Sequence, residues 1–164
     1  MKLIKKILSV FFTLLVIRKV KNYTKPLKVN GLSFVSRNTT LGKNVSFNGI
    51  RISGCGLVTI GNNFHSGKDC LIISENHNFN MGEKIPYDET YICKDINIQD
   101  NVWLGDRVII LAGVTIGEGA IIQAGSVVVS DIPKYAIAGG HPAKVFSQRD
   151  IKHYTKLKEE KKFH

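Results

Sequence analysis

The chain has 164 residues, a length that suits one domain, and its formal net charge of +10 is concentrated at its two ends. Residues 1–28 contain eight basic and no acidic side chains, residues 29–143 contain eight and ten, and residues 144–164 contain seven and three. The nearly neutral central region argues against a nucleic-acid-binding protein, which would carry its basic residues on the folded body. The pattern favours a membrane surface or an anionic ligand near the ends of the chain.

The first predicted element is a basic amphipathic helix within residues 1–25. Lysines precede the apolar run Ile7–Ile17, as in a signal peptide, but Arg18 and Lys19 follow it in place of a small-residue cleavage site. This run is too short to cross a bilayer, which needs about 20 residues. Polar side chains recur at helical spacing and form one narrow stripe, made of Lys2, Lys6, Ser9 and Thr13. Two arrangements stay open: residues 1–22 lie in a membrane interface with their lysines toward anionic headgroups, or the helix packs on the rest of the chain.

Residues 26–146 are predicted to form a β-solenoid, because a six-residue period runs through them. The period is strict from residue 98 to residue 128, where every sixth residue is large and aliphatic: Ile98, Leu104, Ile110, Ile116, Ile122 and Val128. Small or β-branched residues follow each of the first five after four places: Val102, Val108, Val114, Ala120 and Ser126. Side chains return to one face every three or four residues in a helix and every two in a strand, so neither element alone explains the period. A repeated strand-and-turn unit does.

The period is less regular through residues 49–56, restarts at Ile60, and breaks between Ile72 and Ile98. Because the separation of these two residues in the chain is not a multiple of six, residues 74–97 are predicted to leave the solenoid at least partly as a protruding loop. Loops on a rigid scaffold often carry function, and this one contains His77. After the repeat, residues 147–164 form a basic tail in which a short helix is expected.

The three cysteines are Cys55, Cys70 and Cys93. Their number is odd and they lack the paired spacing of metal ligands. We therefore expect reduced thiols in a cytosolic protein, with Cys70 as a small buried residue in a repeat position.

The segments NVWLGDRVIILAGVTIGEGAIIQAGSVVVSDIP and AIAGGHPAKV contain four short motifs in a fixed order: V-W-L-G, G-V-T-I-G, A-G-S-V-V and G-x-P-A-K. In this order and spacing they resemble the C-terminal coils of the hexapeptide-repeat acyltransferases, in particular the branch of galactoside, maltose, xenobiotic and polysaccharide O-acetyltransferases. The resemblance implies an all-β fold, a left-handed parallel β-helix of triangular section. It also implies a homotrimer that binds acetyl-CoA in the groove between neighbouring solenoids.

The resemblance places a catalytic base at His77. A sugar hydroxyl becomes a good nucleophile only as it loses its proton, and histidine can take that proton near neutral pH and return it to the departing thiolate. Glu75 is near enough in sequence to orient the imidazole, and Asn76 and Asn78 are candidates for binding acceptor hydroxyls. Trp103 matches a tryptophan that lies at the active site of the family, where its ring would support the pantetheine arm. We therefore expect His77 to lie beside Trp103.

The remaining candidate residues concern the acetyl-CoA groove. Small residues there permit close approach of the cofactor to the backbone, and the matching positions are Asp106, Ala112, Gly113, Ala124 and Gly125. Lys144 matches a basic position near the nucleotide end.

The most plausible function is an acetyl-CoA-dependent O-acetyltransferase that modifies a sugar hydroxyl, either of a cell-surface polysaccharide or of its precursor. It would act in the cytoplasm, where residues 1–22 could hold it at the inner face of the membrane. N-acetylation of an amino sugar and a non-catalytic scaffold stay open as alternatives. Zinc carbonic anhydrases share this solenoid but need three histidines, and the central region has only His65 and His77, so no metal is expected.

Overall fold

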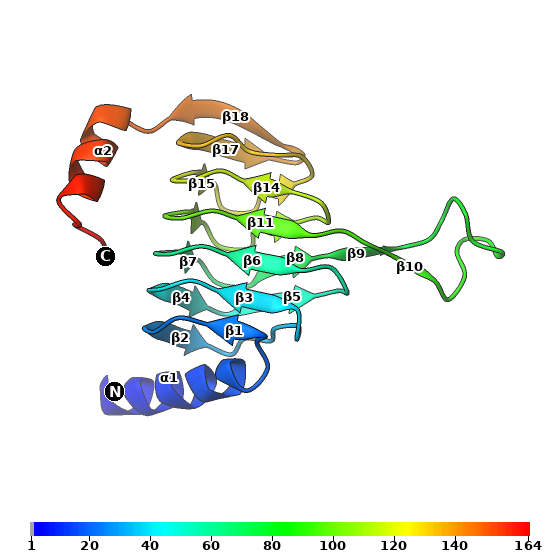
Figure 1. The fold of residues 1–164 in the computed structure, drawn as a ribbon, viewed down its shortest axis with the longest axis horizontal. Coiled ribbons are helices and arrows are strands. Elements are labelled where there is room, and N and C mark those ends of the chain that lie inside the picture. The colour runs from blue at the N-terminus through cyan, green and yellow to red at the C-terminus, as the bar shows by residue number, and fades with distance from the viewer. Residues whose placement is uncertain (1) are drawn as a thin grey trace.

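Each six-residue unit folds as a short strand followed by a turn, and three units complete one coil of a solenoid (Figure 1). The computed structural model describes residues 2–164; Met1, the first residue of the predicted N-terminal segment, lies outside them. Strands pair with the strand one coil later, so that Leu104 lies beside Ile122 and Ile110 lies beside Val128. All pairings between successive coils are parallel.

The coils stack into three sheets, which we call faces A, B and C. Face A has the order β1-β3-β6-β11-β14: β1 (Asn22–Tyr23), β3 (Thr39–Leu41), β6 (Val58–Ile60), β11 (Ile96–Ile98) and β14 (Thr115–Ile116). Face B has the order β18-β17-β15-β12-β7-β4-β2: β2 (Leu27–Gly31), β4 (Val45–Asn48), β7 (His65–Ser66), β12 (Trp103–Leu104), β15 (Ile121–Ile122), β17 (Ala136–Gly140) and β18 (Ala143–Gln148). Face C has the order β16-β13-β8-β5: β5 (Ile50–Ser53), β8 (Cys70–Ile73), β13 (Ile109–Ile110) and β16 (Val127–Val128).

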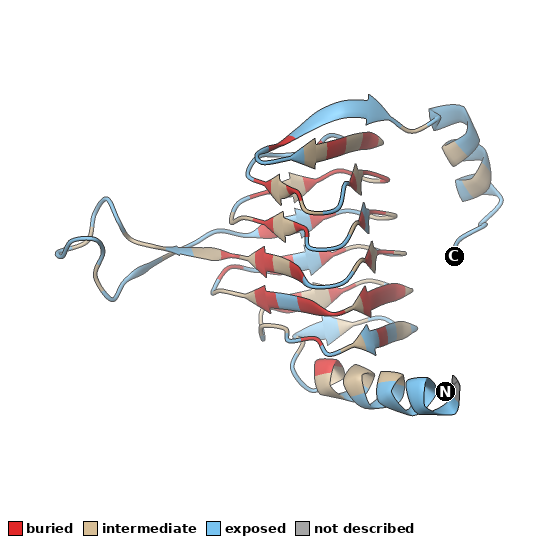
Figure 2. Ribbon diagram, turned by 180° about the vertical axis from the view of Figure 1, so that it is seen from behind, coloured by how far each residue is buried: buried red, intermediate tan, exposed pale blue. Residues whose placement is uncertain are grey.

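The predicted periodic positions form the interior of the solenoid. All six large aliphatic residues between residues 98 and 128 are fully buried, and the small register four places later is buried with them. Figure 2 shows the consequence, since buried residues alternate with partly or fully exposed ones along most of the short strands. The prediction of a hexapeptide solenoid is therefore confirmed.

The corner between faces A and B is built on a column of asparagines. Asn44, Asn63 and Asn101 each occupy the turn at this corner with positive φ, between 54° and 60°. Asparagine tolerates this conformation better than most residues because its short polar side chain bonds locally. The side chains also bond along the column, from Asn44 Nδ2 to Asn63 Oδ1 at 3.0 Å and from Asn63 Nδ2 to Asn101 Oδ1 at 2.9 Å. The column ties three successive coils together.

Helix α1 (Lys2–Ile17) covers the N-terminal end of the solenoid (Figure 1). Val16 is buried against the core, and Thr13 Oγ1 accepts a hydrogen bond from the backbone N–H of Val29 in β2 at 3.1 Å. The helix thus packs on the rest of the chain, which is one of the two expected arrangements. Part of its polar stripe points toward the solenoid. Ser9 and Thr13 face β2, because the edge strand offers them hydrogen-bond partners, and apolar side chains face outward. No helix within residues 2–164 is long and apolar enough to span a bilayer.

The break in the period is a protruding arm. Strands β9 (Glu75–His77) and β10 (Tyr91–Cys93) pair antiparallel and extend away from the solenoid (Figure 1). The coil resumes at Ile96, so the arm is slightly shorter than the predicted loop of residues 74–97. In consequence Ile72 pairs with Ile110 although the whole arm lies between them in the sequence, whereas Ile110 and Val128 are separated by a single coil.

The expectation that all cysteines are reduced is wrong for two of them. Cys55 and Cys93 form a disulfide, with their Cα atoms 5.3 Å apart. The return of the arm brings Cys93 beside the turn that follows β5, a juxtaposition that sequence spacing does not reveal. Cys70 is the buried free cysteine, as predicted, and burial raises the pKa of its thiol.

The solenoid should depend on its interior residues far more than on their outward neighbours. Ile116→Ala, at a fully buried position, should lower the free energy of unfolding by about 2–5 kcal/mol, because it leaves a cavity between coils. Thr115→Ala, the adjacent outward residue of the same strand, should change it by less than about 0.5 kcal/mol. Urea unfolding of both variants checks this, and equal losses would contradict the assigned register.

Candidate functional site

The His77 side chain lies near the base of the arm, between two aromatic rings. Its imidazole stacks on Tyr87, with ring centroids 3.7 Å apart and an interplanar angle of 15°. Tyr91, which is opposite His77 in the hairpin register, packs against the imidazole with ring centroids 4.7 Å apart. Sequence reasoning identified neither tyrosine, because both lie in an aperiodic segment. Together they restrict the orientation of the imidazole.

The other predicted residues of the arm have different surroundings. Glu75 lies on the same side of β9 as His77, since alternate residues of a strand face the same way. His77 Nδ1 is buried and has no hydrogen-bond partner among residues 2–164, so Glu75 does not orient the ring through that atom. Asn76 is exposed. Asn78 is engaged within the arm, where its Nδ2 donates to Thr90 Oγ1 at 3.1 Å and its Oδ1 accepts from the backbone N–H of Met81.

Trp103 does not lie beside His77 within one chain, contrary to expectation. The arm follows β8 of face C, whereas Trp103 belongs to β12 of face B. Trp103 is 52% exposed and stands in register between His65 and Ile121 of the neighbouring coils. The six-residue period predicts that Trp103 points outward. It does not predict whether Trp103 and the arm lie on the same face of the solenoid.

A groove of about 670 Å³ passes Trp103, between face B and the C-terminal helix α2 (Ile151–Glu159). Its lining includes His65, Asp106 and Lys158. Burial, and to a smaller extent the nearby His164, lowers the pKa of His65. The Nε2 atom of His65 has no hydrogen-bond partner among the described residues. Sequence analysis considered His65 only as a possible metal ligand and did not place it beside Trp103, because the whole arm lies between the two residues in the sequence.

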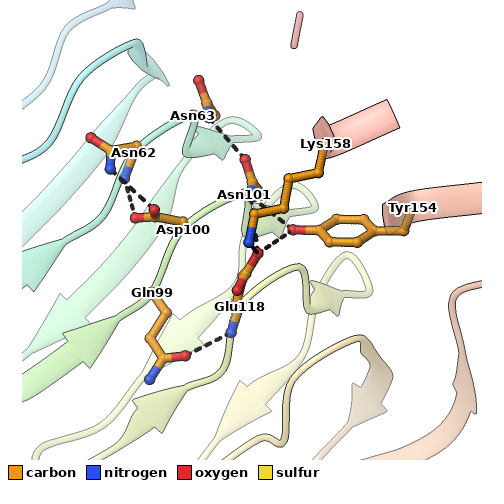
Figure 3. Close-up of polar contacts among 8 residues, drawn as sticks. All are labelled: Asn62, Asn63, Gln99, Asp100, Asn101, Glu118, Tyr154 and Lys158. Carbon is orange, nitrogen blue, oxygen red and sulfur yellow. Dashed lines mark hydrogen bonds and ion pairs between the residues drawn. The ribbon is translucent and has the colours of Figure 1, made fainter. Parts of the chain in front are cut away.

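Helix α2 is attached to the solenoid by a polar cluster centred on Glu118 (Figure 3). Tyr154 Oη donates to Glu118 Oε1 at 2.9 Å and accepts from Asn101 Nδ2 at 2.7 Å. Lys158 Nζ pairs with the same carboxylate at 2.6 Å. Partial burial opposes ionisation of Glu118, but the hydrogen bonds from Lys158 and Tyr154 outweigh it and lower the pKa of the carboxyl group. Burial and the bond to Glu118 raise the pKa of Tyr154.

The predicted cofactor residues divide between two corners of the solenoid. Asp106, Ala124 and Gly125 share the corner between faces B and C, where the backbone N–H of Gly125 donates to the carbonyl of Asp106 at 2.7 Å. Ala112 and Gly113 lie at the corner between faces C and A. The two corners flank face C.

At both corners the backbone is accessible. Gly125 has a φ of 73° and open space where a side chain would begin, and Gly113 has a φ of 90° with only the side chain of Lys94 nearby. Lys144 lies on β18 and is exposed. The coils therefore offer backbone groups along both edges of face C, as a long thin ligand requires. No cluster of three or more potential metal ligands occurs within residues 2–164.

Known proteins resemble this chain in both sequence and fold. Residues 95–130 match the family described as bacterial transferase hexapeptide (six repeats). A protein of Schizosaccharomyces pombe, provisionally named an acetyltransferase, is 46% identical over 88 residues, which are 54% of this chain and 42% of that protein.

Two solved structures extend the comparison. A maltose O-acetyltransferase from Clostridium difficile is 27% identical with a TM-score of 0.63, over 79% of this chain and 66% of that one. A hexapeptide-repeat acetyltransferase from Vibrio cholerae, complexed with acetyl-CoA, has the same identity and coverage with a TM-score of 0.54. The resemblance to hexapeptide-repeat acyltransferases and the left-handed β-helix fold are thereby confirmed. The chain spans less than half of the Schizosaccharomyces relative and about two thirds of the solved chains.

The hydroxyl of Tyr154 should matter for stability. Tyr154→Phe removes both of its hydrogen bonds and should lower the free energy of unfolding by about 1–3 kcal/mol, because the partly buried groups of Asn101 and Glu118 lose a partner. Tyr135→Phe is the matched control, since Tyr135 packs on Tyr154 at 5.0 Å and its hydroxyl makes no comparable bond within residues 2–164. Chemical denaturation of both variants is the measurement, and equal effects would disprove the role of the cluster.

Proposed function

We propose that this chain is an acetyl-CoA-dependent O-acetyltransferase that uses His77 as its general base to acetylate a sugar hydroxyl. The observation that carries the proposal is an imidazole held between Tyr87 and Tyr91 on an arm that immediately precedes the matched hexapeptide coils of residues 95–130. A scaffold without chemistry would not require a histidine held in this way. The solved relatives include a maltose O-acetyltransferase, which supports a sugar as the acceptor.

The proposed reaction transfers one acetyl group and one proton. As the acceptor oxygen attacks the thioester carbonyl, His77 removes the hydroxyl proton. The C–S bond then breaks, and the imidazolium returns the proton to the departing thiolate, giving the acetyl ester and CoA with a free thiol. Because His77 Nδ1 is buried, the proton would move through Nε2.

The proposed acetyl-CoA site uses the corner residues that flank face C. Amides of the pantetheine arm would meet the accessible backbone at Gly125 and Gly113, and the phosphates would meet Lys144. The solved Vibrio relative was complexed with acetyl-CoA, which supports this co-substrate.

The proposed assembly is a homotrimer, and the three faces of the solenoid support it. Outward residues on face A are polar and those on face C are largely apolar, whereas face B is polar in its first coils and apolar in its later ones. The residues compared are Thr40, Thr59, Asn97 and Thr115 on face A; Lys28, Ser46, His65, Trp103, Ile121 and Ile137 on face B; and Arg51, Leu71, Ile109 and Val127 on face C. Apolar outward residues favour association. A head-to-tail contact of face B with face C closes a ring of copies, and it would bring Trp103 of one copy toward the arm of the next.

His77→Ala should test the proposed chemistry. We expect kcat for acetyl transfer to fall by about 10²–10⁴-fold, the usual contribution of a general base, with the oligomeric state unchanged. His153→Ala is the matched control, because His153 is exposed on α2 and should retain full activity. Turnover over free, nucleotide-linked and polymeric sugars, followed by mass spectrometry, is the measurement. Undiminished activity would overturn the role of His77, and acetyl groups found only on nitrogen would favour the alternative, an amino-sugar N-acetyltransferase.

We also propose that α1 holds the protein at the inner face of a membrane. The outward side of α1 carries exposed apolar residues, including Ile4, Ile7 and Phe11, which are 62%, 60% and 53% exposed. Residues 1–28 contain eight basic and no acidic side chains, which complements anionic headgroups.

The membrane proposal predicts lipid-dependent sedimentation. The double variant Ile7→Asp, Phe11→Asp should reduce cosedimentation with phosphatidylglycerol vesicles by about fivefold or more, because it places charge in the inserted surface. Phe146→Asp alters an aromatic residue that is 62% exposed at the other end of the solenoid and should leave binding unchanged. Equal sedimentation of the wild type, the double variant and the Phe146→Asp variant would contradict the proposal.

A further inference from the structure

The arm that carries His77 has few attachments to the rest of the chain. Beyond its base it consists of two short strands and a connecting loop, and a two-stranded hairpin is marginally stable by itself. Side chains toward its tip contribute little packing, since Met81 is 84% exposed and Ile85 is 99% exposed. The position of His77 therefore depends on how the base of the arm is held.

The base of the arm is clamped by the turn that follows β5. The hydroxyl of Ser74, the residue before β9, lies 3.1 Å from the carbonyl oxygens of both Ser53 and Gly56 and shares its one donated proton between them. A side chain at Gly54 would collide with Ser74, and one at Gly56 would collide with the backbone of Lys94. Both ends of the arm thus lie against this one turn.

The disulfide joins that turn to the returning strand of the arm. Cys55 lies in the turn between the two glycines, and Cys93 ends β10. In the hairpin, Cys93 is opposite Glu75 and is two residues from Tyr91, which packs on His77. Cys55 and Cys93 are both exposed, so a reductant in solution can reach the bond.

We infer that the Cys55–Cys93 disulfide is a redox-sensitive positioning element that fixes β10, and through Tyr91 the imidazole of His77, for catalysis. This inference rests on the proposed function, because it assigns the disulfide an effect on acetyl transfer. Cys55 and Cys93 do not touch the reacting atoms; they act through the tyrosine. When the bond is broken, β10 keeps its pairing with β9 and the backbone bond from Lys94, the next residue, to the Ser74 carbonyl, but it loses its covalent link to the turn, and the stack on His77 loosens.

The switching reaction is thiol–disulfide exchange with a dithiol. A thiolate of the dithiol attacks one protein sulfur and forms a mixed disulfide, and its second thiolate then displaces the remaining protein sulfur. The protein gains two electrons and two protons as two thiols, and the dithiol becomes a disulfide. Dithiothreitol supplies this chemistry in the experiment.

The test compares the oxidised and dithiothreitol-reduced full-length protein with two variants, Cys55→Ser/Cys93→Ser and Cys70→Ser. Reduction should lower kcat by about tenfold or more, as loss of alignment does, and change KM for acetyl-CoA by less than about twofold, because the proposed cofactor contacts lie on the coils. The double serine variant should have the lowered kcat of the reduced protein, and dithiothreitol should not change it. Cys70→Ser should respond like the wild type, since Cys70 is outside the disulfide.

Tryptic cleavage after Lys84, an exposed residue of the arm, gives a readout that does not need activity. Reduction should accelerate this cleavage by about fivefold or more, while the thermal unfolding transition of the solenoid core should stay the same. Equal kcat in the two redox states, equal cleavage rates, or free thiols at Cys55 and Cys93 in the oxidised protein would each overturn the inference. If neither state transfers acetyl groups, the proposed function fails, and the cleavage rates still decide whether the disulfide holds the arm.

Discussion

The structure depends on one constraint, the burial of one large aliphatic side chain from every six residues in a column shared by successive coils. Leu104 stacks in register with Ile122, and Ile110 with Val128, all fully buried, so a shift of register within a strand would move these residues out of the core. Extra residues are therefore placed between strands: Ser46 pairs with His65 and Ile50 with Cys70, one and two residues beyond the 18 that separate Leu104 from Ile122. The largest insertion, the arm with His77, also lies between two strands of the coils.

The same constraint determines where chemistry can occur. Because the interior is filled by aliphatic side chains, polar and aromatic residues with a function must point outward or lie on appended elements. The candidate residues follow this rule: Trp103 is on face B, Gly113 and Gly125 are at the corners that flank face C, and His77 is on the arm. Figures 1 and 2 show the arm and α2 on opposite sides of the solenoid. One chain therefore separates components that a single catalytic site would need, and contact between copies offers a physical way to combine them.

The sequence was most informative where interactions repeat at a fixed spacing. The buried register, the interruption near His77 and the buried Cys70 all follow from the period. What could not be predicted depends on contacts between segments whose relative placement the period does not specify. The disulfide of Cys55 and Cys93 and the stacking of Tyr87 on His77 arise from the path of the arm.

The central claim is that the catalytic site forms between copies of the chain, with His77 from one and Trp103 from the next. Coexpression of a His77→Ala chain with a Trp103→Ala chain tests it most directly, once each alone is shown to be inactive. In randomly mixed head-to-tail trimers, about a quarter of the interfaces would combine an intact His77 with an intact Trp103, so activity should return to about a quarter of the wild-type value. Mixed trimers without activity would contradict the claim.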